Sequence, residues 1–145
     1  MPRLMCSGIT MTALDRILVD TSAWIEFFRQ IEPCHSIVLQ LMSEERVCTM
    51  GIIVAELMQG AKSEKELAVL RDFAYVFPIL SDSQENWQAA GVLSFRLRQN
   101  GKAIGLADCY IATVAKAEGA MILSLDHHFQ MMKDEAGIKL LGISP

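Results

Sequence analysis

Four acidic side chains stand out in this sequence because their settings are otherwise apolar. Asp20 and Asp126 each follow directly after a short apolar run, and Glu56 and Asp108 each lie inside a longer one. Carboxylates are rarely placed among apolar residues unless they have a partner. The four acids are therefore the first candidates for a functional site.

Four carboxylates that meet in one place cannot all stay ionised, because their mutual repulsion raises their pKa values and protonates some of them. A bound Mg²⁺ or Mn²⁺ would remove this repulsion, since both ions accept carboxylate oxygens and keep several waters. Such an ion can activate water and stabilise charge on a phosphoryl oxygen. A shared site would therefore indicate phosphodiester hydrolysis.

Taken singly, each acid has a simpler explanation. Asp20 and Asp126 could cap the helices that follow them. Glu56 could lie on a solvated helical stripe, and Asp108 could interact with the dipole of a helix N-terminus. A common site therefore requires that the fold bring the four acids together.

Short apolar runs alternate with longer helical patterns along the chain. The runs predict strands over residues 17–19, 47–49, 121–123 and 138–141, with a peripheral strand over 75–79 that contains Pro78. The helical patterns predict helices over 23–29, 36–45, 52–61, 64–73, 106–118 and a short segment after 126, and a long helix to 99 with a capping box over 81–85. The helix over 106–118 is apolar nearly all round, so we expect it to be deeply buried.

This alternation predicts an α/β fold with a mainly parallel central sheet. Sites in such sheets form beyond the carboxyl ends of the strands. Asp20 and Asp126 end predicted strands, and Asp108 lies at a helix N-terminus. We therefore expect these acids to face one edge of the sheet.

The composition bounds the class of protein. Apolar residues make up 52% of the 145 residues and charged residues 21%, which is typical of a globular domain. We expect one domain over residues 15–145 and a flexible tail over 1–14. The net charge of −4 argues against a protein that coats nucleic acid non-specifically, but it leaves room for an enzyme that meets nucleic acid through a metal ion.

The cysteines and the apolar runs indicate a cytoplasmic protein. Cys6, Cys34, Cys48 and Cys109 form no CxxC pair, and none lies at zinc-finger spacing from a histidine, so we interpret them as reduced, buried thiols. No apolar run approaches the roughly 18 residues of a membrane span, and the N-terminus lacks the continuous apolar segment of a secretory signal.

Four segments of the chain together resemble the acidic motifs of the PIN-domain family. They are residues 17–26, 54–60, 105–112 and 124–129, and their order and spacing fit that family over about residues 16–143. Within the family, the chain is most similar to bacterial VapC-type toxins of type II toxin–antitoxin systems. The resemblance implies a PIN-like three-layer α/β/α domain, a metal-dependent endoribonuclease that cuts RNA, a cognate antitoxin partner and a homodimer.

The resemblance also implies roles for individual residues. Asp20, Glu56, Asp108 and Asp126 would hold Mg²⁺ or Mn²⁺ and its waters. Thr21, Ser22 and Ser124 would orient the carboxylates or water.

The chain departs from the family at His128, where many members have a second aspartate. A water-mediated contact, an RNA phosphate contact and a simple surface position are all open for His128. We favour the surface position for both His127 and His128.

Contacts to substrate and partner are less clearly marked. Arg96, Arg98 and Lys102 precede Asp108, and Lys102 lies in a turn where it could meet a phosphate. Charged residues on a long helix are also typical of a solvated face. An apolar surface on the first two helices could bind an antitoxin helix; its candidate residues are Trp24, Phe27, Phe28, Leu39 and Met42.

Two other functions stay open, and two further classes of protein lack residues that they would need. A PIN-domain nuclease in RNA processing, outside toxin–antitoxin systems, is the main alternative, and a non-catalytic PIN-like interaction module is a second, although all four acids are present. A phosphoacceptor receiver domain would need paired acids after the first strand and a suitable lysine. A DxD-type phosphatase would need an aspartate at position 22, which is Ser22.

Overall fold

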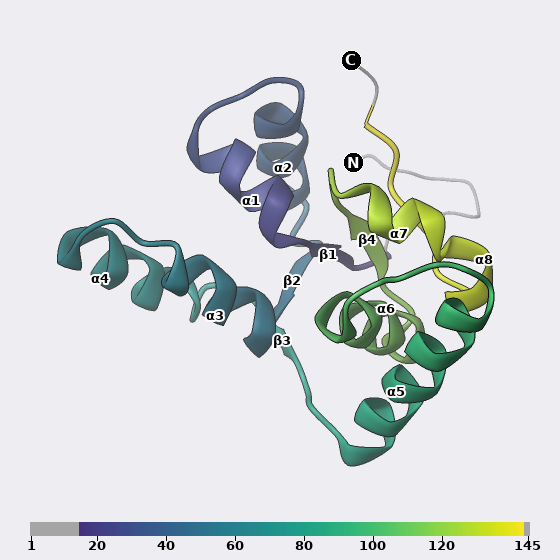
Figure 1. The fold of residues 1–145 in the computed structure, drawn as a ribbon. Helices are drawn as coiled ribbons and strands as arrows, with labels where there is room; N and C mark the ends of the chain where they lie inside the picture. Colours follow the sequence, from purple (N-terminus) through teal and green to yellow (C-terminus); the bar gives the residue numbers. More distant parts are fainter. Residues whose placement is uncertain (1–14, 144–145) are drawn as a thin grey trace.

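The computed structural model describes residues 15–143, and this part of the chain folds around a parallel sheet (Figure 1). The strands are β1 (Ile17–Val19), β2 (Val47–Met50), β3 (Ile79–Leu80) and β4 (Met121–Leu123). They lie in the order β3-β2-β1-β4, and every neighbouring pair is parallel. The expected α/β fold with a parallel central sheet is confirmed.

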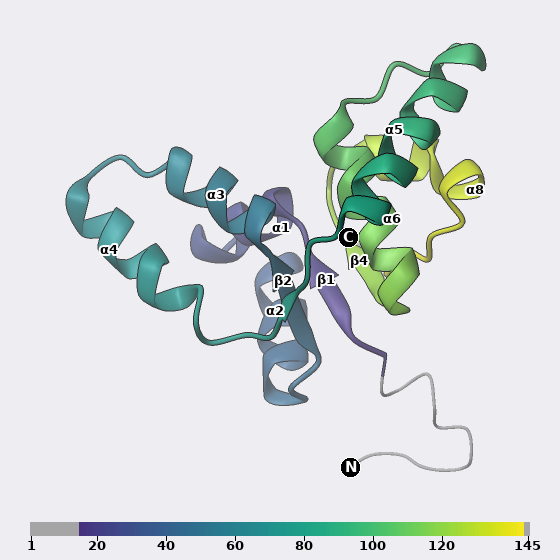
Figure 2. The same cartoon turned by 90° about the horizontal axis from the view of Figure 1, so that it is seen from below.

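Helices follow the strands in the expected alternation. They are α1 (Thr21–Phe28), α2 (Cys34–Ser43), α3 (Gly51–Gln59), α4 (Glu64–Phe73), α5 (Gln84–Gln99), α6 (Leu106–Glu118), α7 (His127–Met131) and α8 (Lys133–Ala136). Helices α1 to α4 gather on one side of the strands, and α5, α6 and α8 gather on the other (Figures 1 and 2). The sheet is thus a middle layer between two groups of helices.

β1 is the central strand of the sheet because it pairs with both β2 and β4. Ile17 aligns with Val47 on one side and with Met121 on the other. All three residues of β1 are fully buried. A continuous apolar run is what a parallel strand covered on both faces requires.

Two predicted strands at the margins are largely absent. In the segment 75–79, only Ile79 joins the sheet, because the preceding residues form hydrogen-bonded turns after α4 and Pro78 has no N–H to donate. In the segment 138–141, only Leu140 pairs with β4, because the N–H of Ile138 still donates to Lys133 at the end of α8.

The long helix α5 starts at a different cap from the one predicted. Ser83 precedes its first turn in extended conformation, and its hydroxyl accepts a hydrogen bond from the N–H of Asn86. The capping box predicted over residues 81–85 is therefore wrong. The cap is a single serine hydroxyl at the start of the helix.

The core is centred on α6, as its apolar sequence predicts. Six of its residues are buried, among them Tyr110, whose ring stacks on Trp87 of α5 with the centroids 3.5 Å apart. Helix α4 is the opposite case, since it has no buried residue and extends away from the sheet in both views. Its partly buried Leu70 and Phe73 pack against the core.

The described cysteines behave as buried thiols. Cys34, Cys48 and Cys109 are buried and unpaired, and burial raises the pKa of Cys48 to about 11. Cys6 and the predicted tail over residues 1–14 lie outside the described residues. No helix in the described part of the chain is both long and apolar enough to cross a membrane.

We expect Leu18→Ala to lower the free energy of unfolding by about 2–5 kcal/mol, because Leu18 is fully buried in the central strand and its removal leaves a cavity. Urea denaturation monitored by circular dichroism measures the change. Val69→Ala on α4, where the side chain is 56% exposed, should stay within about 0.5 kcal/mol of the wild type. Equal losses in both variants would contradict the burial pattern.

Candidate metal centre

The carboxyl edge of the sheet brings the predicted acids together. Asp20 follows β1, and its N–H donates to the carbonyl of Leu123, the last residue of β4, at 2.9 Å. Asp126 is the N-cap of α7, three residues after the end of β4, and Asp108 lies in the first turn of α6. The ends of two adjacent strands and the start of the core helix therefore meet at one place.

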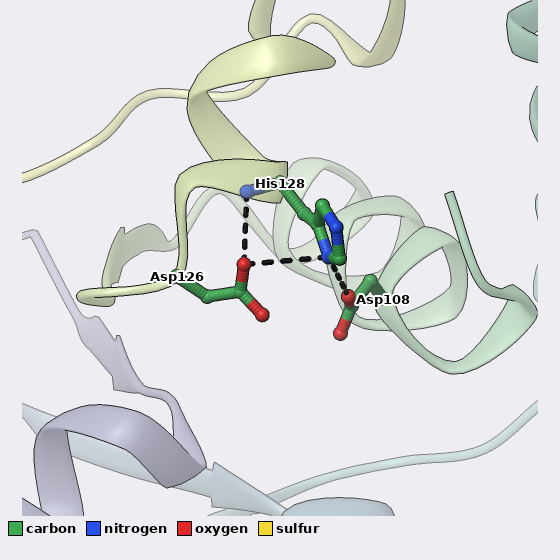
Figure 3. Close-up of side chains that lie close together, drawn as sticks. All are labelled: Asp108, Asp126 and His128. Atoms are coloured by element: carbon green, nitrogen blue, oxygen red, sulfur yellow. Dashed lines mark hydrogen bonds and ion pairs between the residues drawn. The ribbon is translucent and has the colours of Figure 1, made fainter. Parts of the chain in front are cut away.

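Asp108, Asp126 and His128 form a compact group at this edge (Figure 3). The ring Nδ1 of His128 lies 3.1 Å from Oδ2 of Asp108 and 3.3 Å from Oδ1 of Asp126. One potential ligand atom from each residue lies within 4.8 Å of the others. All three side chains are partly exposed, so the group is reachable from solvent.

Asp20 is deeper, and two serine hydroxyls connect it to this group. The residue is 5% exposed, and its Oδ2 accepts hydrogen bonds from Ser124 at 2.9 Å and Ser22 at 3.3 Å. The Ser124 hydroxyl also accepts from the N–H of Asp126 at 3.0 Å. Ser22 and Ser124 therefore lie where hydroxyls can orient Asp20 relative to Asp126.

Glu56 approaches the site from α3 through a hydroxyl. Its Oε1 accepts a hydrogen bond from Thr21 Oγ1 at 2.7 Å, and Thr21 follows Asp20 directly. Glu56 is not part of the compact group of Asp108, Asp126 and His128. The structure thus places Glu56 beside Asp20, with its second carboxylate oxygen not engaged by Thr21.

Burial and repulsion disfavour the ionised acids. Burial raises the pKa of Asp20, and hydrogen bonds from Ser124 and Ser22 only partly offset it. Burial also raises the pKa of Asp108, and the charges of Asp126 and Asp20 raise it further, while the hydrogen bond with His128 acts in the opposite direction. Too little positive charge therefore lies near these acids to stabilise their ionised forms.

The same observations show that the residues present fit a divalent cation. Carboxylate oxygens with one ring nitrogen are suitable ligands for such an ion. The ion pairs that Asp108 and Asp126 make within residues 15–143 involve only His127 and His128. A cation at this edge would relieve the repulsion that raises the pKa of Asp108.

The capping explanations hold for one acid and fail for another. Asp126 does cap α7, since its Oδ1 accepts from the N–H of His128 at 2.9 Å, yet it also belongs to the acidic group. Asp20 occupies the N-cap position of α1 but makes no side-chain capping bond. Its carboxylate is turned to Ser22 and Ser124 instead.

His128 is where our sequence interpretation is wrong. We favoured a surface position for both histidines, and this is confirmed for His127, whose side chain is 78% exposed. His128 instead contacts two carboxylates, with its side chain 35% exposed. The pattern that could have signalled this is its position two residues after Asp126, the N-cap of α7, which places His128 in the first turn of that helix.

Within residues 15–143, the predicted basic residues form no ion pair with the four acids of the site. Lys102 Nζ donates to Glu135 at 2.7 Å and to the carbonyl of Met131 at 3.0 Å, so its charge is directed to α7 and α8. Arg96 and Arg98 are exposed in the last turn of α5. As substrate contacts all three stay predictions, and for Lys102 the ion pair would have to open.

A parallel sheet whose carboxyl edge carries a carboxylate cluster suited to a divalent ion defines the class of protein: an α/β domain with an acidic site at the carboxyl ends of its strands. Sequence comparison gives the family. The PIN domain family matches residues 17–135, and the chain therefore belongs to the PIN domain family.

Individual relatives agree with this assignment. The VapC ribonuclease Mb1587 of Mycobacterium bovis is 31% identical over 121 residues, which cover 80% of this chain and 90% of that protein. The structure is similar to VapBC2 from Rickettsia felis bound to a promoter DNA fragment, with a TM-score of 0.70, 21% identity and coverage of 86% of this chain and 96% of that one. It is also similar to VapBC-5 of Mycobacterium tuberculosis, a member of the VapBC family of toxin–antitoxin systems, with a TM-score of 0.60, 18% identity and coverage of 90% and 99%. At these identities the two structural similarities show the fold alone.

We expect Asp20→Asn to stabilise the metal-free protein at neutral pH, because it removes a buried charge. The folded pKa is raised, so the destabilisation is absent below the ordinary pKa of 3.8 and is complete once the pH rises through the folded value. The free energy of unfolding in EDTA at pH 7 should increase by about 0.5–2 kcal/mol, and the gain should vanish in acid. The exposed Asp134→Asn is the control, and a less stable Asp20→Asn at pH 7 would contradict this account.

Proposed function

We propose that this chain is a metal-dependent endoribonuclease of the VapC type that is neutralised by a cognate antitoxin. The observation that carries the proposal is the convergence of Asp20, Asp108 and Asp126 on one edge of the sheet, with Glu56 tied in through Thr21. The relatives that are named VapC ribonuclease support the choice of RNA as the substrate. The coordinating groups favour Mg²⁺ or Mn²⁺ as the ion.

In this proposal Asp20, Asp108 and Asp126 hold the ion, which would supply electrophilic stabilisation of the phosphate that is cut. Ser22 and Ser124 keep the buried Asp20 carboxylate in a fixed orientation. Thr21 engages one oxygen of Glu56 and leaves the other to accept a proton from the attacking water. Each of these tasks uses a contact that exists in the folded chain before substrate binds.

The antitoxin would bind the exposed apolar residues of α1 and α2. Phe28 is 42% exposed and Leu39 is 47% exposed, and both belong to the surface predicted from the sequence. Trp24 does not belong to it, because its ring is fully buried against Phe27, Phe28, Phe73 and Phe77. Similarity to toxin–antitoxin structures supports such a partner. The homodimer implied by the family resemblance stays a prediction.

The alternatives predict different outcomes. A non-catalytic PIN-like module would bind partners and leave RNA intact. Such a module would have no use for the acids at this edge of the sheet. A nuclease of RNA processing would cut RNA without an inhibitory partner encoded beside it. Cleavage and partner binding therefore have to be measured separately.

We expect the purified protein to cut a mixed pool of RNA oligonucleotides with Mg²⁺ or Mn²⁺ and to stop in EDTA. Asp20→Asn and Asp108→Asn should each reduce the cleavage rate by more than about 100-fold, because each removes a direct ligand. Gel electrophoresis of labelled RNA measures the rates, and circular dichroism checks the fold.

Asp134→Asn is the matched control for these two variants, since it makes the same change at an exposed site on α8. It should cut at the wild-type rate. If all four proteins cut RNA equally, the activity belongs to a contaminating nuclease and the proposed site is not catalytic.

We expect Leu39→Asp to prevent capture of the protein encoded beside this chain when the two are co-expressed. The substitution places a charge within the proposed apolar interface, where it would have to be desolvated. Phe95→Asp on α5, where the ring is 57% exposed on the other side of the sheet, should still capture the partner. Recovery of the partner with both variants would place the interface elsewhere.

A further inference from the structure

The position of the His128 side chain is explained neither by helix capping nor by simple exposure at the surface. Its ring nitrogen Nδ1 points between two carboxylates that come from different elements, Asp108 on α6 and Asp126 at the start of α7 (Figure 3). His127, the preceding residue, shows the contrast: its nearest carboxylate oxygen is 3.9 Å away and its side chain is 78% exposed. The ring of His128 therefore belongs to the acidic edge.

The distances around Nδ1 also suit a shared ion. Neighbouring ligands of an octahedral ion with bonds of about 2.1 Å lie about 3 Å apart. The two carboxylate oxygens lie 3.1 Å and 3.3 Å from Nδ1. A nitrogen at this spacing can donate a proton to one carboxylate, or present its lone pair to an ion held by both.

We propose that Nδ1 of His128 is a direct ligand of the divalent ion, and that it makes the site selective for Mn²⁺ over Mg²⁺. The inference rests on the proposed metal-dependent function and specifies its ion. Imidazole nitrogen is a softer ligand than carboxylate oxygen, so it favours transition metals over Mg²⁺. Of the two ions proposed for this site, Mn²⁺ is the transition metal, so it tolerates a nitrogen ligand beside carboxylate oxygens better than Mg²⁺ does.

The charge of the ligands also favours Mn²⁺ over Mg²⁺. A neutral histidine adds a donor to Asp20, Asp108 and Asp126 without adding a further negative charge. Affinity for the hard Mg²⁺ depends strongly on the number of charged oxygens, whereas Mn²⁺ gains from the nitrogen as well. Replacement of the imidazole by a carboxylate should therefore strengthen Mg²⁺ binding more than Mn²⁺ binding.

Pulsed electron paramagnetic resonance of the full-length protein, stripped of metal and loaded with Mn²⁺ alone, tests the ligand directly. We expect a nitrogen coupling typical of a bound imidazole, and we expect it to change to the ¹⁵N pattern in protein made with ¹⁵N-histidine. This isotope test needs no variant that has to fold. His127→Ala should keep the coupling, and His128→Asp should lose it while still binding Mn²⁺.

Selectivity is measured by titration of the same proteins with Mn²⁺ and by competition with Mg²⁺. The ratio of the Mg²⁺ to the Mn²⁺ dissociation constant should fall about tenfold in His128→Asp and stay unchanged in His127→Ala. Mn²⁺ that binds the wild type but not Asp20→Asn, and shows no nitrogen coupling, would overturn this inference and leave the proposed function standing. If neither ion binds the wild type, both this inference and the proposed function are wrong.

Discussion

Asp20, through its backbone and its buried carboxylate, is the residue on which this end of the molecule depends. Its N–H joins the end of β1 to the carbonyl of Leu123, and its own carbonyl accepts the N–H groups of Ala23 and Trp24 that begin α1. Its side chain is meanwhile held by serine hydroxyls in a place where burial opposes ionisation. One residue therefore takes part in the pairing of β1 with β4, begins α1 and places a charge where it is unfavourable. A residue that lowers stability in this way is typical of a functional site.

Hydroxyl groups link Asp20 and its neighbour Thr21 to two of the other acids, Asp126 and Glu56. Ser124 bonds both the Asp20 carboxylate and the N–H of Asp126, and Thr21 bonds Glu56 on α3. These contacts are short and come from residues next to strand ends, where the backbone is held by the sheet. Acids that are far apart in the sequence thus keep a fixed relation without contacting one another directly.

Much of this arrangement could be predicted from the sequence because parallel strands leave little freedom. The runs 17–19 and 121–123 form strands with those bounds, and the acids that follow them have to lie at the same edge. The helix over 106–118 also has its predicted bounds, since its apolar circumference requires a buried position.

The features that the sequence did not predict correctly share one cause, because each of them depends on tertiary contacts. The predicted strands over 75–79 and 138–141 are too long, because a two-residue strand and a single bridge leave almost no periodic pattern in the sequence. The direction of the His128 ring depends on Asp108, which is 20 residues earlier on another helix. Lys102 is paired with Glu135, which is 33 residues later on α8.

Helix α4 gives the molecule two unequal levels of stability. It has no buried residue, and its partly buried Leu70 and Phe73 pack against the core. Amide protons of α4 should therefore exchange with solvent through local opening, while those of α6 exchange only when the whole domain unfolds. Since Asp20 follows β1, Asp126 follows β4 and Asp108 lies on α6, the projecting helix can fray and re-form without disturbing the elements that position these three acids.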